Sequence, residues 1–312
     1  MYPLKTPAAT AALRLSLRAA LRAAALSATA VAPLALSACG ASQTQLAGEM
    51  KLGEAKDASA ASAAVEAGDA LWAARGDRAK AEEAIKRWEE AAALDPTQAS
   101  THLKLSYAYY FIANVHVRWE EESEDAQGAL FDKGVKAGER AILAQNPDFK
   151  KALETQKWEE AVTQVSKEGI ASLYWYATNL GKWSLLQGIG TTLGNKPRIK
   201  STMDQVLKLD ETFYHGAPHR YFGVYEAKVP FGDIAKSGAS FDKAIELAPL
   251  YLDTKVLKAE YFAAKQQDEE LFKKLLGEVI AADPKAIPDL EVENTNSQRI
   301  AKKMLDNISD FF

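Results

Sequence analysis

The chain has 312 residues, of which 47% are hydrophobic and 26% are charged, and its formal net charge is −4 at pH 7. A chain of this length and composition can bury a sizeable core, and its lack of excess positive charge argues against binding to nucleic acid. Cys39 is the single cysteine, so the sequence excludes an intrachain disulfide and a zinc site built from several thiolates.

Residues 1–38 have the pattern of a bacterial lipoprotein signal peptide. They contain four basic residues and no acidic one, and the uncharged stretch 23–36 is shorter than the roughly 20 apolar residues of a spanning helix. The sequence from Leu36 to Cys39 resembles the lipobox, at which the leader is cleaved and the cysteine is acylated. We expect residues 1–38 to be removed, which leaves 274 residues and, without the four basic ones, a net charge of −8. The alternative is an amphipathic helix that is never cleaved.

Lipidation of Cys39 would attach the chain to a bilayer, because two or more acyl chains hold a protein stably on a membrane. Gly40 and Ala41 stand where lipoproteins retained at the inner membrane carry an aspartate, so we expect an outer-membrane anchor facing the periplasm. The rest of residues 39–57 is rich in small and polar side chains. This composition predicts a flexible tether with a root-mean-square span of about 23 Å.

Residues 58–312 are predicted to form one all-α domain, because apolar residues recur at spacings of three and four and strand-like alternation is nearly absent. In four places a bulky residue is followed at intervals of three by a small or branched residue and an apolar one, and then by a helix stop. These places are residues 88–96, 203–211, 241–249 and 276–284. The pattern resembles the second helix of a tetratricopeptide repeat and predicts helical hairpins stacked into a compact solenoid. A generic helical bundle is the alternative.

An aromatic-rich helix is predicted around residues 107–111. Four of these five residues are aromatic, namely Tyr107, Tyr109, Tyr110 and Phe111. Four such side chains cannot all face one side of a helix. We expect them to pack against neighbouring helices, and a ligand or a second subunit is the alternative.

Residues 170–186 form a predicted helix that is apolar on nearly all sides, so we expect it to be buried or to line a cavity. In one interpretation its aromatic side chains only close the core. In the other, Trp175 and Trp183 border an apolar pocket, with tyrosine hydroxyls at its rim and residues 215–224 at its mouth. The candidate ligand-binding residues are Tyr174, Trp175, Tyr176, Trp183, His219, Tyr221 and Phe222.

The histidines do not have the spacing of a metal site. His215 and His219 are four residues apart, but a glycine and a proline between them break the helix that would present both to one ion. We expect no metal, no cofactor and no catalytic residue.

Two further patterns are assigned to surface structure. Gly188, Gly190 and Gly194 do not fit a dinucleotide fingerprint, and we expect a loop between helices there. The acidic run 120–125 predicts a solvated helix end and loop, or alternatively a surface that faces a basic partner.

The order of several segments resembles the T component of tripartite ATP-independent periplasmic (TRAP) transporters. These segments are residues 171–183, 203–210, 219–223 and 256–312, and the resemblance spans nearly all of the mature chain. It implies a lipoprotein with tetratricopeptide-like helices that forms a homotrimer and contains an apolar cleft. It also implies association with the solute-binding P component and a hydrophobic or amphiphilic small molecule as cargo.

Two functions of different classes remain. The first is a non-catalytic accessory of a TRAP-type transport system that binds a hydrophobic small molecule, docks a solute-binding protein, or does both. The second is a tetratricopeptide-like scaffold that organises envelope or secretion machinery through protein contacts alone. A continuous apolar void beside Trp175 and Trp183 would favour the first, and solid packing of those rings would favour the second.

Overall fold

The structure is a computed structural model that describes residues 52–229 and 231–312. Within these ranges it contains thirteen α-helices and no strand, which confirms the all-α prediction. The predicted signal peptide, Cys39 and residues 39–51 of the predicted tether lie outside the described residues. None of the described helices has both the length and the apolar character that crossing a membrane requires.

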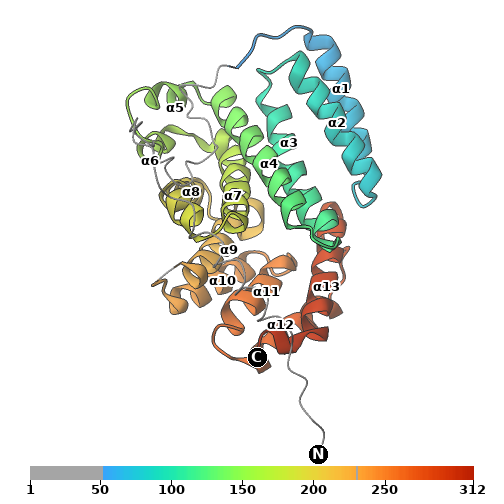
Figure 1. Cartoon of the computed structure of the whole chain (residues 1–312), viewed down its shortest axis with the longest axis vertical. Helices are drawn as coiled ribbons and strands as arrows, with labels where there is room; N and C mark the ends of the chain where they lie inside the picture. Colours follow the sequence, from blue (N-terminus) through green and yellow to red (C-terminus); the bar gives the residue numbers. More distant parts are fainter. Residues whose placement is uncertain (1–51, 230) are drawn as a thin grey trace, which may run out of the picture. The chain divides into compact units, whose positions relative to one another are not determined.

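The helices follow one another with short connections (Figure 1). Their bounds are α1 Ala58–Trp72, α2 Arg78–Leu94, α3 Ala99–Phe111, α4 Glu124–Gln145, α5 Pro147–Ala152, α6 Trp158–Ala161, α7 Ile170–Leu186, α8 Ile189–Leu209, α9 Phe213–Lys228, α10 Ile234–Leu247, α11 Asp253–Lys258, α12 Glu269–Ala281 and α13 Glu291–Asp306. One π-helical turn, Ile112–His116, continues α3, and another, Ala259–Ala263, continues α11.

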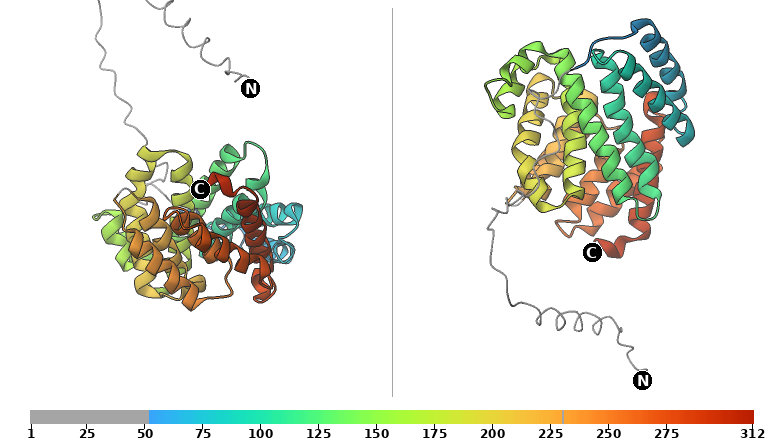
Figure 2. Two further views of the ribbon diagram at one scale, coloured as in Figure 1. Left: turned by 90° about the horizontal axis from the view of Figure 1, so that it is seen from below. Right: turned by 45° about the horizontal axis from the view of Figure 1, so that its top comes forward.

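Consecutive helices pack as pairs, namely α1 with α2, α3 with α4, α7 with α8, α9 with α10 and α12 with α13. Helix α7 also packs against α4 and α3, so it lies between α4 and α8 (Figures 1 and 2). Its side chains Leu173, Tyr176 and Leu180 are fully buried in the largest of three apolar clusters. The stacking of the pairs into a tetratricopeptide-like solenoid stays a prediction.

The four repeated sequence patterns each lie at the end of a helix, as predicted. Helices α2, α8 and α10 end at the predicted apolar residue, and α12 ends one residue earlier, at Ala281. The first two positions of each pattern are buried in the described structure, for example Phe241 and Ala244 in α10. The repeated pattern therefore marks the buried face and the end of each of these helices.

Aspartate side chains define several helix starts. The carboxylates of Asp57, Asp77, Asp233 and Asp268 accept hydrogen bonds from backbone N–H groups in the first turns of α1, α2, α10 and α12. Just before Asp57, the backbone N–H of Lys56 donates to the carbonyl of Leu94 at 2.8 Å. The described residues before α1 are thus attached to the end of α2.

The prediction of a loop at Gly188, Gly190 and Gly194 is wrong for two of these glycines. Only Gly188, with a φ of +96°, precedes α8, whereas Gly190 and Gly194 lie inside that helix. Side chains of α8 hydrogen-bond back to the end of α7, because the Thr192 hydroxyl donates to the Ser184 carbonyl and the Asn195 amide donates to the Ser184 hydroxyl, both at 3.0 Å. These bonds fix the first turns of α8 in spite of the low helix propensity of glycine.

Candidate functional site

A cavity of about 460 Å³ lies among α3, α7, α8, α9, α11 and α13. Its lining extends along the sequence from Tyr107 to Ile300. A volume of this size is typical of sites for small molecules, which are usually concave and largely apolar. The cavity is therefore the candidate functional site.

Trp175 of α7 is at the centre of an aromatic wall of this cavity. Its ring centroid lies 4.5 Å from that of Tyr107, 5.2 Å from that of Tyr110 and 5.1 Å from that of Tyr214. Tyr174 adds a further edge-to-face contact to Trp175 at 4.8 Å. Such packing holds each ring in a fixed orientation and presents a rigid apolar surface to the cavity.

An unusual backbone turn places Tyr214 in this wall. Tyr214, His215 and Gly216 have φ values of 40°, 62° and 70°, which separate the start of α9 from its regular part. At Gly216 a Cβ would lie 3.2 Å from the Cα of Ala244, which is a tight contact with α10, and the positive φ of this position also favours glycine. The helix is interrupted at Gly216, as predicted, whereas Pro218 lies inside the regular part of α9.

Arg220 fixes this turn from the next part of α9. Its guanidinium donates to the carbonyls of His215 at 3.0 Å and Tyr214 at 3.4 Å. It also lies 4.3 Å from the ring centroid of Tyr251, on which the His215 ring stacks. Arg220 is nearly fully buried, and its hydrogen bonds compensate the cost of burying its charge.

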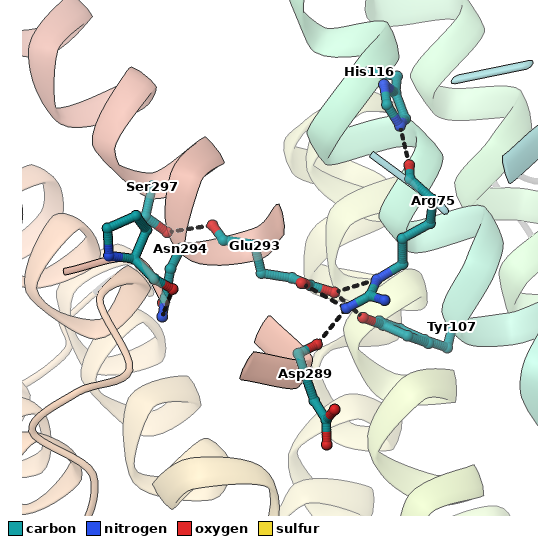
Figure 3. Close-up of polar contacts among 8 residues, drawn as sticks. Arg75, Tyr107, His116, Asp289, Glu293, Asn294 and Ser297 are labelled. Carbon is teal, nitrogen blue, oxygen red and sulfur yellow. Dashed lines mark hydrogen bonds and ion pairs between the residues drawn. The ribbon is translucent and has the colours of Figure 1, made fainter. Parts of the chain in front are cut away.

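A second polar cluster connects the first and last parts of the described chain (Figure 3). The guanidinium of Arg75, which follows α1, pairs with the carboxylate of Glu293 in α13 through two contacts of 3.0 Å. Tyr107 donates its hydroxyl to the same carboxylate at 2.5 Å, and Arg75 also donates to the carbonyl of Asp289. Burial and the charge of Glu293 raise the pKa of Tyr107, so it stays a hydrogen-bond donor at neutral pH.

The lining carries more positive than negative side chains. The cationic residues are Arg118, Lys182, Lys196, Arg220 and Lys228, and the carboxylates are those of Asp253, Glu260 and Glu293. Since Glu293 is already paired with Arg75, two carboxylates face five cations. The cavity is therefore an aromatic chamber with positive charge, although the whole chain is acidic.

Three of the seven residues predicted to bind a ligand line this cavity, namely Tyr174, Trp175 and Tyr221. The other four lie outside its lining. Tyr176 is fully buried and stacks on Trp158 at 4.7 Å, and Trp183 packs into the core cluster around α7. His219 contacts the carboxylate of Glu211 at 2.9 Å, and Phe222 lies against Tyr221 beneath Lys200.

Several lining residues were not among the predicted site residues. Lys182 is seven positions after Trp175, so the helical period alone places both on one face of α7. Tyr107 and Tyr110 belong to the predicted aromatic helix and face the cavity, whereas Tyr109 packs on its other side and donates to Glu89. No local signal in the sequence places Tyr214 or Tyr251 in the wall, because their positions depend on the turn at residues 214–216 within α9 and on the packing of α11.

The histidines have structural contacts. The His102 ring contacts the carbonyl of Pro96 at 2.8 Å, and the His116 ring contacts the carbonyl of Arg75 at 2.9 Å. In the described part of the chain, no three residues of the metal-binding types gather closely enough to hold an ion.

The family model described as TRAP transporter T-component matches residues 81–312 of the chain. This range contains every residue that lines the cavity. None of the curated proteins matches the chain.

Proposed function

Since the chain belongs to the TRAP transporter T-component family, which supplies an accessory component of TRAP transport systems, we propose that it holds a hydrophobic small molecule in the aromatic cavity. Binding is non-covalent and is driven by burial of apolar surface against Trp175 and its neighbouring rings. The observation that carries this proposal is the cavity itself, since a helical scaffold that works through its surface alone needs no internal chamber.

The mouth of the cavity supports a docking role as well. Leu185, Ile189 and Leu193 line the cavity and are 42%, 67% and 46% exposed. Clustered exposed apolar side chains are typical of surfaces that contact another protein. We propose that the connection between α7 and α8 docks the solute-binding component, so that a ligand passes between the two proteins without crossing water.

The remaining parts of the proposal concern anchoring and assembly. Acylated Cys39 attaches the protein to the outer membrane, the following segment acts as a tether, and the helical domain faces the periplasm as a homotrimer. The support is the lipobox sequence and the family, whose members belong to the cell envelope. The apolar mouth also fits the alternative scaffold function, in which α7 and α8 bind a protein and the cavity stays without cargo.

Gly181 offers a direct test of the ligand-binding role. It lines the cavity, and no heavy atom lies within 4 Å of where its Cβ would be, so Gly181→Phe fills the chamber without displacing the core. Gly277→Phe in α12 is the matched control, because Gly277 is also helical and has equally open surroundings but lies outside the cavity.

The assay is fluorescence titration with the neutral apolar dye N-phenyl-1-naphthylamine, using residues 39–312. We expect saturable binding to the wild type and to Gly277→Phe, and at least tenfold weaker binding to Gly181→Phe. Equal binding to both variants would show that the dye does not enter this cavity. Absence of saturable binding to the wild type would favour the scaffold function.

A further inference from the structure

Lys182 is the one cation of the cavity lining for which the described structure provides no partner. Arg220 donates to backbone carbonyls, while Lys196 and Lys228 lie over the rings of Tyr225 and Tyr261 at 5.6 and 4.9 Å. Arg118 lies 5.4 Å from the ring centroid of Trp119. Among residues 52–229 and 231–312, no hydrogen bond, ion pair or ring contact involves the Lys182 ammonium group.

The surroundings of Lys182 do not compensate its charge. Burial, and then the neighbouring charge of Arg118, lowers the pKa of the Lys182 ammonium group. Asp253 and Glu260 raise that pKa, but neither carboxylate lies within ion-pair distance of the lysine in the described structure. A partly buried cation without a partner is unfavourable and would be stabilised by an anion that enters the cavity.

The position of Lys182 along α7 adds a geometric constraint. Lys182 and Trp175 are seven residues apart on one face of the helix, which separates them by about 10 Å along the helix axis. The exposed Leu185 comes next toward the mouth, so the cation lies between the opening and the aromatic wall. A ligand that entered through the mouth would therefore meet the charge beside the opening and the aromatic surface deeper inside.

We propose that the cavity takes an amphiphilic monoanion, a carboxylate with an apolar body of about 10 Å, whose headgroup pairs with Lys182 while its body packs against Trp175. This inference rests on the proposed ligand-binding function and adds the charge and the orientation of the ligand. Together with Lys182, Arg118 and Lys228 give three cations in this part of the lining, against the two carboxylates of Asp253 and Glu260.

The test compares three ligands with the same ten-carbon chain, which are decanoate, decanol and decylammonium. Isothermal titration calorimetry is performed below the critical micelle concentration on the wild type, Lys182→Met and Lys182→Arg. Lys274→Met in α12 is the control, because Lys274 is exposed and lies outside the cavity lining. Circular dichroism checks that each variant keeps its helical content.

We expect the wild type and Lys274→Met to bind decanoate at least tenfold more tightly than decanol, and decylammonium most weakly. Lys182→Met should lose the preference for decanoate while its affinity for decanol stays within about threefold of the wild type, and Lys182→Arg should keep the preference. Equal affinities of the wild type for decanoate and decanol would overturn the inference and leave the proposed function standing. Failure of all three ligands and of the neutral dye to bind would overturn both.

Discussion

The carboxyl group of Glu139 should make the stability of the domain fall as the pH rises. Glu139 lies on α4, its side chain is fully buried, and neither carboxylate oxygen has a hydrogen-bond partner in the described structure. Burial raises its pKa from 4.5 to about 8, against the opposing charges of Arg198 and Arg140. The native protein therefore keeps this carboxyl protonated over a range in which the unfolded chain has already released the proton.

The sign and size of the effect follow from this difference. Between pH 4.5 and about 8 the native state binds one proton more at Glu139 than the unfolded state, so the free energy of unfolding decreases with rising pH. The decrease is about 1.4 kcal/mol per pH unit, or on the order of 4 kcal/mol between pH 5 and pH 8. Below pH 4.5 both states are protonated at this residue, and its contribution no longer changes.

Urea unfolding followed by tryptophan fluorescence at pH 5 and pH 8 measures the effect for the wild type and Glu139→Gln. The difference between the two proteins isolates Glu139, because His102 and His215, whose pKa values are lowered by burial, change stability in the opposite direction with pH. We expect the variant to gain stability relative to the wild type as the pH rises. Glu66→Gln, at an exposed position of α1, should behave like the wild type. The same stability difference between wild type and Glu139→Gln at both pH values would refute the reasoning.

Three further predictions concern the packing and ends of the helices. A double-mutant cycle of Arg75→Met and Glu293→Gln should give a coupling energy of about 1–3 kcal/mol in urea unfolding, and additive effects would contradict the pairing of α13 with the first hairpin. Gly138→Ala should destabilise by about 1–3 kcal/mol, because its Cβ would lie 2.9 Å from the Cα of Tyr176, and an unchanged melting temperature would show that α4 and α7 can separate. Asp233→Ala should cost about 1 kcal/mol through loss of the cap of α10, whereas Asp233→Ser should restore most of it.

The helical fold could be predicted from local sequence because the determining signals are local. Trp88, Ala91 and Leu94 repeat at intervals of three and stop before proline, which fixes both the buried face and the end of α2. The glycine-rich start of α8 was missed because hydrogen bonds to Ser184 in another helix hold it in helical form. Such tertiary contacts override a low local propensity and cannot be read from spacing.

The cavity was predictable only in part, through the apolar helix α7 and through Tyr221 in the segment 215–224. The apolar character of α7 identified Trp175 and Tyr174, but the choice between Trp175 and Trp183 depends on the packing of α3 and α9 around α7. Tyr214 lies in the wall because three consecutive residues adopt positive φ, a conformation that its sequence does not require. The helical period places Lys182 on the same face of α7 as Trp175, but its lack of a partner in the described structure is visible only once every neighbouring element is in place.

Because the cavity is built from helices spread over nearly 200 positions of the chain, from Tyr107 to Ile300, it exists only when these distant helices have packed together. A ligand bound there stabilises the native state alone, by an amount that grows with the logarithm of its concentration above the dissociation constant. Occupied protein would then unfold at a higher temperature and resist proteolysis more strongly than empty protein. In the cell envelope, the supply of cargo would thereby set how long each molecule survives.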